Sequence, residues 1–421
     1  MSETALKRNI KIYPFYRAFS YDFLFFWTIS ILFLTEVKGL SYSQVILLDS
    51  LFMLSAFCLQ VPISKMIRKI GRANSARLGA IAYLGFAFLN TFGTNFWWFL
   101  LANVSYGIGA AIKTVADTEI LSLSLQKLNR KNEFSKIDGK AMFWYYLFEG
   151  LTSVVAGYLF EFVNPYAPVI GTAILSMACL IFAFIIKDPA SGEDSSQEVK
   201  QVEAKNEPSY KALLKRPFVI WMAIFCFSFF GISSVHQTMS KVYLQNINVP
   251  AYLFGYIFCG YRIIAAIASK FQFKYELKRG VKILLISSFM MVTAYIATAI
   301  IYTIAADAVI SIIVVLLIFA SQHISRSLYR ITVKNYINQC VTKRALTRTL
   351  TIYSMAEFLG YSLTTLFVSL VMEISGNSYL ITNFSLVGVF IIPLTLSVIF
   401  FMRALIKSYM SRCTIVRKDL E

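Results

Sequence analysis

The feature that most limits how this chain can fold is a series of long apolar runs that recurs almost from end to end. A bilayer requires about 20 apolar residues for each spanning helix, and runs of about that length fill most of the chain. Hydrophobic residues make up 57% of the sequence, whereas a soluble globular chain contains roughly 45–50%. The runs predict an all-α polytopic membrane protein rather than a soluble one.

The apolar runs divide into two groups of six. The first six predicted helices are 13–35, 43–63, 76–93, 95–123, 139–160 and 166–186, and the second six are 217–244, 251–273, 282–304, 307–333, 347–372 and 379–404. Residues 187–216 are polar and rich in Ser and Glu, a composition typical of a flexible linker. We therefore expect an N-terminal six-helix bundle (1–186), a cytoplasmic linker (187–216), a C-terminal six-helix bundle (217–404) and a cytoplasmic tail (405–421). A passive tether and a regulatory segment both remain open for the linker.

The net charge of +18 is distributed as in a membrane protein, not as in a nucleic-acid-binding one. Lys and Arg fall mostly in the connections after the second, fourth, eighth and tenth predicted helices, as in the stretches 65–77, 127–136, 274–282 and 334–348. The opposite connections contain Glu36, Glu161, Asp307 and Glu373. This asymmetry follows the positive-inside rule. It predicts an inner (plasma) membrane protein with both termini in the cytoplasm and no nucleic-acid partner.

The basic N-terminal segment runs into the first span without a small-residue cleavage site, so we expect it to be retained.

The remaining composition argues against an enzyme. The six Cys residues are scattered without a CxxC pair, which indicates buried thiols rather than a metal site or a disulfide framework. The sequence contains no ATP-binding motif and no nucleophile–base pattern. We expect no cofactor and no metal.

Two local patterns carry a family resemblance. Ser64 to Ala73 keeps a base at Lys69 and the pair Gly71-Arg72, and so resembles the loop motif of the major facilitator superfamily. It departs from that motif at Arg68, where the family has Asp. Asn103 to Ala111 keeps the small residues, Gly107 and Gly109 among them, of the fourth-helix motif of drug–proton antiporters. It lacks the Arg of that motif, and the antiporter motif of the fifth helix is absent.

The resemblance implies a fold and a mechanism for the whole chain. Twelve helices in two pseudo-symmetric bundles would work by alternating access as a monomer, with the first, fourth, seventh and tenth helices around a central cavity. Small residues such as Gly107 and Gly109 allow neighbouring helices to approach closely. The loop motif would act as a cytoplasmic latch. We expect Arg68, Lys69, Gly71 and Arg72 to face the acids Asp117 and Glu119, with Arg72–Asp117 as the pair. Topology-setting positive charge is the alternative role of these bases.

Ionisable residues in mid-span are the other candidates for function, because each carries an insertion penalty of about 2.5–3.5 kcal/mol at a helix centre. Glu149 and Arg262 lie on helices expected to touch, so we predict an ion pair, either static or remade during transport. Arg17 and Lys113 lie nearer the ends of their spans, where a long side chain can snorkel to the interface. The candidates for proton or substrate binding are Asp22, Glu149, His236, Arg262, His323 and Glu357.

The function that these features favour is proton-coupled efflux of an amphipathic small molecule such as a drug. Aromatic clusters, for example Phe25-Phe26-Trp27, offer stacking surfaces for a flat ligand. Transport of a specific metabolite, sugar, peptide or organic anion is the alternative within transport. A lipid flippase or a transporter-like receptor is the alternative of another class.

Overall fold

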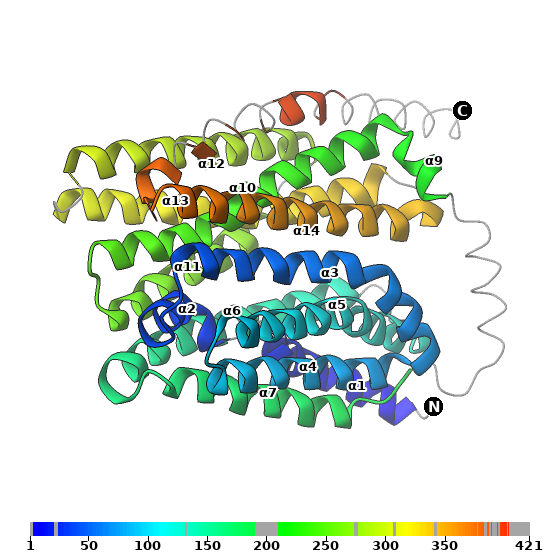
Figure 1. Ribbon diagram of the computed structural model, residues 1–421. Coiled ribbons are helices and arrows are strands. Elements are labelled where there is room, and N and C mark those ends of the chain that lie inside the picture. Colours follow the sequence, from blue (N-terminus) through cyan, green and yellow to red (C-terminus); the bar gives the residue numbers. More distant parts are fainter. Residues whose placement is uncertain are drawn as a thin grey trace. The chain divides into compact units, whose positions relative to one another are not determined.

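The computed structural model describes residues 3–20, 24–130, 133–189, 209–272, 277–305, 309–340 and 343–376, together with parts of 378–403. Every regular element in this part of the chain is a helix (Figure 1). At some helical positions, Arg68 among them, only the backbone is described. Most of the predicted linker and the tail lie outside the described residues.

The first part of the chain forms seven α-helices and two π-helical turns in the described residues. Their bounds are α1 Glu3–Ser20, α2 Phe26–Leu32, η1 Phe33–Val37, α3 Tyr42–Ile70, α4 Arg72–Phe92, α5 Phe96–Lys127, α6 Phe134–Tyr158, η3 Leu159–Val163 and α7 Ala167–Ile185. The prediction of one continuous helix over 13–35 is wrong. The chain starts helical ten residues earlier, at Glu3, and Leu24 and Phe25 form a turn between α1 and α2.

The second part continues with long helices. Their bounds are α9 Tyr210–Leu214, α10 Pro217–Asn246, α11 Ala251–Gln272, α12 Leu277–Ala305, α13 Val309–Cys340 and α14 Lys343–Ile374. These match the predicted spans within a few residues at most ends, and α13 and α14 extend further than expected. The last predicted span, 379–404, is described only in part.

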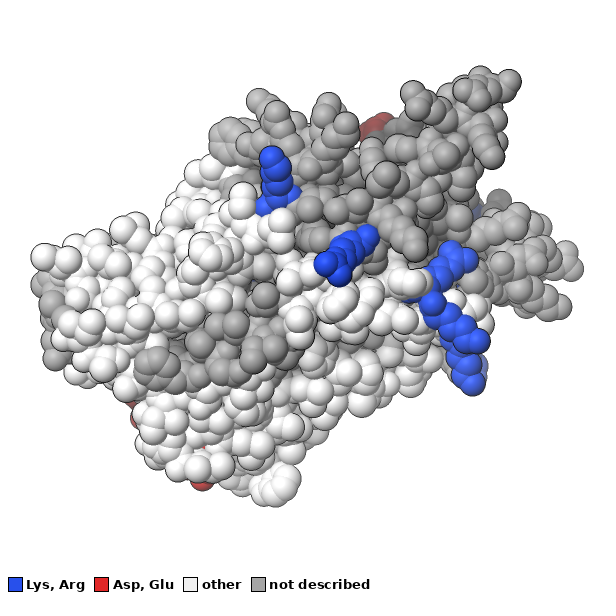
Figure 2. All heavy atoms as spheres, turned by 90° about the horizontal axis from the view of Figure 1, so that it is seen from above, with Lys and Arg blue, Asp and Glu red and all other residues white. Residues whose placement is uncertain are grey.

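The fold is an all-helical polytopic membrane fold. Eight of the described helices are long and apolar enough to cross a membrane, and the shorter apolar helices Phe26–Val37 and Ala251–Ile267 accompany them. Large apolar side chains such as Phe88, Phe92 and Ile174 are exposed, as expected for a surface in contact with lipid. On the face shown in Figure 2, most of the described surface consists of residues other than Lys, Arg, Asp and Glu.

The chain divides into two compact units. The first contains Met1–Glu193 and Lys241–Ala266, and the second contains Asp194–Ser240 and Ile267–Glu421. Helices α10 and α11 therefore each have residues in both units. Within the first unit, α5 packs against α3 and α4, α7 packs against α4, and α1 packs against α5, α6 and α7. Within the second unit, α12 packs against α13.

Local sequence signals explain several helix boundaries. The Ser41 side chain accepts a hydrogen bond from the Gln44 backbone N–H, and the Gln44 side chain accepts one from the Ser41 N–H. This reciprocal arrangement is a capping box, which begins α3. Asn95 caps α5 in a similar way by accepting bonds from the two N–H groups of Trp97 and Trp98. The starts of α3 and α5 therefore follow from residues adjacent to them in the sequence.

The small residues of α5 lie where neighbouring helices come closest. A Cβ atom at Gly107 would lie 2.8 Å from the Phe52 carbonyl oxygen on α3, and one at Gly109 would lie 2.5 Å from the Tyr83 ring on α4. Real Cβ atoms essentially never approach another atom within 3.0 Å. The two glycines of the motif thus serve two different helix contacts, one on each side of α5.

Candidate functional site

The motif loop is held by a residue far away in the sequence. Gly71 links α3 to α4 with a φ of 87°, a conformation that favours glycine. The Asp188 carboxylate lies beside it, accepting hydrogen bonds from the backbone N–H of Arg72 at 2.5 Å and of Ala73 at 3.3 Å. A Cβ at Gly71 would lie 2.6 Å from the Asp188 Oδ2 atom. Asp188 therefore caps α4, and Gly71 leaves the space for it.

The expected pair Arg72–Asp117 does not form. The Arg72 Nε atom lies 2.8 Å from the Glu119 Oε2 atom instead. Residues two positions apart on a helix point roughly 200° apart around its axis, so Asp117 and Glu119 cannot face the same partner. Glu119 faces the start of α4, and Asp117 faces α1. Lys69 is exposed, and the Arg68 side chain is not among those that the structure describes.

Asp117 is the acceptor of a buried hydrogen-bond network with α1. It receives bonds from the Tyr16 hydroxyl at 2.7 Å, from Arg17 Nη1 at 3.1 Å and from the Ser20 hydroxyl at 3.2 Å. The Asp117 side chain is fully buried, and that of Arg17 is 12% exposed. A buried carboxylate is tolerated when it is paired and hydrogen-bonded in this way.

Lys113 extends this network, contrary to the expectation that its side chain snorkels to the interface. It is 1% exposed, and its Nζ atom lies 2.8 Å from the Tyr16 hydroxyl oxygen and 3.3 Å from the Cys179 sulfur. The ammonium also lies over the rings of Tyr16 and Tyr83, 4.5 and 5.5 Å from their centroids. Lys113 therefore points inward, into the centre of the first unit.

Glu149 and Arg262 come together as an ion pair within the first unit. The Glu149 side chain, on α6, is 1% exposed, and the Arg262 side chain, on α11, is 11% exposed. The two helices approach each other closely at Gly157 of α6. A Cβ atom at this position would lie only 2.6 Å from the Ala251 carbonyl oxygen, so the absence of a side chain permits the approach. The role of the pair in transport stays a prediction.

Two cationic side chains lie against the Trp27 ring in the same region. The Lys241 ammonium lies 3.6 Å and the Arg262 guanidinium carbon 4.8 Å from the centroid of its ring. Lys241 also donates to the Trp27 carbonyl oxygen and to the Ser30 hydroxyl. The Phe258 ring contacts Trp27 edge to face, with 5.6 Å between centroids. We call Trp27, Glu149, Lys241, Phe258 and Arg262 the Trp27 cluster.

The two histidines meet within the second unit. The His236 and His323 rings lie 5.6 Å apart between centroids. Phe319 lies 5.0 Å from the His236 ring and Tyr295 lies 6.4 Å from it. His236 is buried, and its Nε2 atom has no hydrogen-bond partner among the described residues. The imidazole nitrogen atoms of the two histidines thus lie among aromatic side chains.

The two remaining candidates are Glu357 and Asp22. Glu357 on α14 is buried and accepts a 2.6 Å hydrogen bond from the Tyr353 hydroxyl, one turn earlier on the same helix. Asp22 lies outside the described residues.

Sequence reasoning missed Lys113, Lys241 and Asp188 as parts of these sites. For Lys113 a signal was available, because it precedes Asp117 by four residues and so shares its helix face. Lys241 lies near the end of a long span, and Asp188 opens a polar segment. Nothing local in the sequence indicates that either side chain contacts residues far from it.

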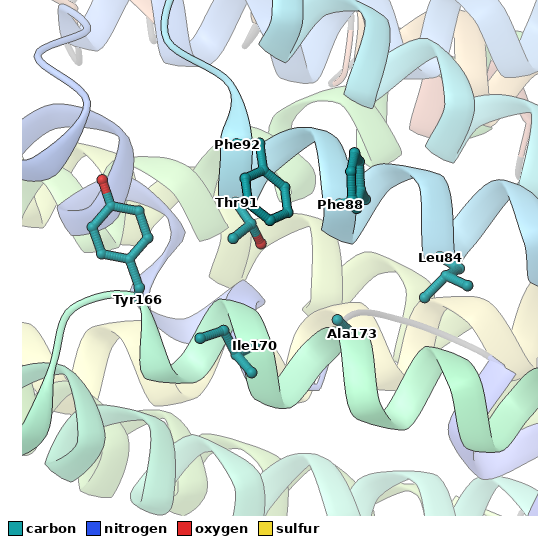
Figure 3. A pocket seen from close by; sticks show the side chains of 7 residues that line it. All are labelled: Leu84, Phe88, Thr91, Phe92, Tyr166, Ile170 and Ala173. Carbon is teal, nitrogen blue, oxygen red and sulfur yellow. The ribbon is translucent and has the colours of Figure 1, made fainter.

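A groove between α4 and α7 is visible at close range (Figure 3). Its walls are almost entirely apolar, and the Thr91 hydroxyl in it donates to the Ala87 carbonyl oxygen. Phe88 and Phe92 are largely exposed there. The groove therefore has the character of a lipid-facing surface rather than of a polar recognition site. It is lined by Leu84, Phe88, Thr91, Phe92, Tyr166, Ile170 and Ala173.

Comparisons with known proteins agree with this architecture. Residues 17–319 match the sequence profile of a family described as Major Facilitator Superfamily. No curated protein sequence matches the chain. The chain is similar to a solved mutant of the nucleoside transporter NupG, with a TM-score of 0.71 and 11% identity over 95% of this chain and 99% of that one. It is also similar to a bacterial homologue of the human lysosomal transporter Spinster, inward-facing and unoccupied, with a TM-score of 0.68 and 14% identity over 98% and 99% of the two chains. At these identities the likeness shows the fold alone.

Proposed function

The chain belongs to the major facilitator superfamily of secondary transporters, and on that premise we propose that it exports an amphipathic small molecule in exchange for protons. It is not an enzyme. The proposed cycle is alternating access, in which buried charges change partners as the site opens to one side and then to the other.

The Trp27 cluster is the observation that carries the proposal. An amphipathic ligand requires a flat apolar surface and a charged group within reach of one another. The cluster supplies the Trp27 and Phe258 rings together with the Glu149, Lys241 and Arg262 charges. Aromatic faces and buried charges gathered in one place are typical of sites that bind amphipathic molecules.

The Glu149–Arg262 pair supports coupling to protons. A proton on Glu149 would neutralise the carboxylate and weaken its attraction to Arg262, which frees the guanidinium for another partner. A buried charge without a partner is strongly disfavoured, so substrate and proton would compete for the same groups. Such competition is what exchange of one for the other requires.

The orientation that we propose follows the charge of the loops, with both termini in the cytoplasm of the cell that carries the protein. The Gly71 loop would then lie on the cytoplasmic side. Fusions of a reporter that is active on only one side of the membrane, made at the described turns near Gly71 and Gly93, would test this. We expect opposite reporter activities at these two positions, and equal activities would contradict the orientation.

A growth assay with a panel of amphipathic compounds tests the function. Cells that express the protein should tolerate some of these compounds at severalfold higher concentration than cells that do not. Efflux of such a compound should stop when a protonophore collapses the proton gradient. The matched control is an expressed Glu149→Gln variant, which should give no protection. Protection that survives the protonophore would contradict proton coupling.

A specific organic anion is the second candidate substrate, favoured by the two cations that share the Trp27 ring. Uptake of radiolabelled anions into proteoliposomes would distinguish it from drug export. The same vesicles with fluorescent phospholipids would detect a flippase, because lipid movement without any drug phenotype would contradict both transport proposals.

A further inference from the structure

The groove between α4 and α7 ends at a lysine. Lys38 follows η1, and its Nζ atom lies 3.1 Å from the Thr91 carbonyl oxygen and 2.9 Å from the Gly93 carbonyl oxygen. The ammonium also lies 4.8 Å from the centroid of the Tyr166 ring. Thr91 and Tyr166 both line the groove (Figure 3). An almost entirely apolar groove therefore carries a positive charge at one end.

We expect this end of the groove to lie at the surface of the membrane. Lys38 bonds the end of α4 and the turn that follows it, and Trp97 and Trp98 lie on the first turn of α5. Both indole rings are exposed. Tryptophan side chains gather at the headgroup level of a bilayer. The Lys38 ammonium is therefore placed where it can meet a lipid headgroup.

The Lys38 ammonium retains a donor for a further partner. An ammonium has three N–H donors, and the two carbonyl oxygens accept two of them. Among the described residues Lys38 forms no ion pair, and Glu36, two positions earlier, accepts a hydrogen bond from α10. The centroids of the Phe33, Phe99 and Tyr166 rings lie 5.4, 5.8 and 4.8 Å from the ammonium. A half-buried cation in such surroundings favours an anion as its next partner.

The apolar part of the groove continues from the charged end toward the interior of the bilayer. Its volume is about 560 Å³. Thr91 and Leu84 lie seven positions apart on α4, and so do Tyr166 and Ala173 on α7, which corresponds to about 10 Å along each helix. The groove is therefore long enough to hold part of an acyl chain lengthwise. A charge at the membrane surface followed by an apolar groove matches the phosphate and the chain of a phospholipid.

Tyr166 adds a second polar group at the charged end. Figure 3 shows it at the end of the groove opposite Leu84 and Ala173. Among the residues that the structure describes, its hydroxyl has no hydrogen-bond partner. Tyrosine is well suited to this level of the membrane, because its ring is apolar and its hydroxyl can bond a headgroup.

The charge of the headgroup distinguishes one phospholipid from another. A zwitterionic phospholipid carries a cationic group next to its phosphate, and this group would lie near the Lys38 ammonium. Phosphatidylglycerol offers the phosphate and two hydroxyl groups without that cation. A soluble phosphate would meet the ammonium but leave the apolar groove uncovered.

We propose that the groove between α4 and α7 binds an anionic phospholipid. The phosphate lies at Lys38, the Tyr166 hydroxyl donates to the headgroup, and one acyl chain runs along Phe88 and Ile170. The lipid supplies the counter-ion of Lys38 and links the end of η1 to α4 and α7. Such binding requires neither a transported compound nor a proton gradient.

Native mass spectrometry of the purified full-length protein in detergent tests the headgroup contact. The protein is titrated with phosphatidylglycerol and with phosphatidylcholine of the same acyl chains. Wild-type protein should bind phosphatidylglycerol about fivefold more tightly, the effect of one lysine on an anionic lipid. Lys38→Met should remove this preference. Lys7→Met is the matched control, since Lys7 is exposed and pairs with Glu3, and it should retain the preference.

Two results of this titration would overturn the site. Equal affinity of the wild type for the two lipids would mean that only ordinary bilayer contact occurs at this surface. A preference that persists in Lys38→Met would place the anionic lipid elsewhere.

A second variant fills the groove and keeps the charge. Ala173→Phe should lower the affinity for phosphatidylglycerol severalfold, because its ring occupies the space of the chain. Ile174→Phe is the control, since Ile174 is exposed at the next position and does not line the groove. Unchanged binding in Ala173→Phe would contradict the place of the chain. Displacement of the lipid by glycerophosphoglycerol, which has the headgroup alone, would show a site for soluble phosphate instead.

Thermal unfolding provides an independent readout. A ligand that binds the native state raises the unfolding temperature. Phosphatidylglycerol should therefore raise that of the wild type and of Lys7→Met, but not that of Lys38→Met. The same measurement without lipid checks that each variant is folded. An equal rise in Lys38→Met and wild type would contradict the role of Lys38.

Discussion

Asp188 caps the helix that begins at Arg72, although 116 positions separate the two residues. Its carboxylate accepts the backbone N–H groups of Arg72 and Ala73, which have no partner within the helix. Asn9 secures the same segment from α1 by bonding both the N–H and the carbonyl oxygen of Lys187. The first unit therefore binds the start of the segment that follows α7.

This cap predicts a loss of stability in Asp188→Ala. Removal of a capping side chain lowers the free energy of unfolding by about 1 kcal/mol, and the negative charge at a helix N-terminus adds a few tenths to this. Asp188→Asn should retain most of the stability, since an amide oxygen can accept the same bonds. Thermal unfolding in detergent would measure both variants. Equal unfolding temperatures in Asp188→Ala and wild type would show that the cap is not stabilising.

Gly71→Ala should destabilise the protein more than Asp188→Ala does. A non-glycine residue at a φ of 87° is strained by about 1–3 kcal/mol, and its Cβ would also displace the Asp188 carboxylate. The double variant Gly71→Ala, Asp188→Ala removes that clash and should be less unstable than the sum of the two single changes. Strict additivity in the unfolding measurements would argue against the contact.

The Arg72–Glu119 pair predicts a change in conformational balance with little change in stability. The Glu119 side chain is 41% exposed, and exposed ion pairs contribute about 0–1 kcal/mol. Arg72→Ala should therefore unfold near the wild-type temperature but shift the proportion of inward-open and outward-open molecules. Distances between spin labels would report that proportion. If neither the distances nor transport change, the latch hypothesis is wrong and the bases only set topology.

Substitution of Glu149 or Arg262 should strongly lower the free energy of unfolding, and the two losses should not be additive. Removal of one partner of a buried ion pair costs about 3–5 kcal/mol, because the other charge stays buried without compensation. Glu149→Gln and Arg262→Gln should each show this loss, and the double variant should recover part of it. Thermal unfolding of the four proteins gives the coupling energy. Recovery of stability without recovery of transport would assign the pair a role in the cycle beyond structure.

Substitutions of Trp27 should reduce compound tolerance in proportion to the loss of its aromatic face. Trp27→Phe keeps an aromatic face for Lys241 and Arg262, whereas Trp27→Leu removes it and with it about 0.5–2 kcal/mol for each cation. Compound tolerance in the growth assay should fall in the order wild type, Phe, Leu. Trp97→Leu is the matched control, since Trp97 is exposed. An equal loss in the Phe and Leu variants would show that the ring face is not what matters.

The sequence predicted the helices better than the contacts between them. The spans from α3 to α7 and from α10 to α14 follow their apolar runs closely, since apolar length is a local property. The first span was predicted as one helix because its apolar run is continuous across the turn at Leu24 and Phe25. Glu149 and Arg262 were paired from an expected adjacency of two helices. Arg72 was assigned the wrong acid because the rotation of α5 about its own axis could not be read from the sequence.

By itself, the sequence determined the class of the protein, the positions of most spans and the set of ionisable residues inside them. Transfer of each residue into a bilayer contributes almost independently of its neighbours, so a linear pattern is enough for these conclusions. Only the tertiary structure decided which residues these side chains contact. Asp117 accepts hydrogen bonds from Tyr16 and Arg17, and Lys113 points inward. Lys241 and Arg262 both lie against the Trp27 ring, and Asp188 caps α4. Each of these depends on how a helix is rotated and where it crosses its neighbours. Packing among residues far apart in the chain determines both.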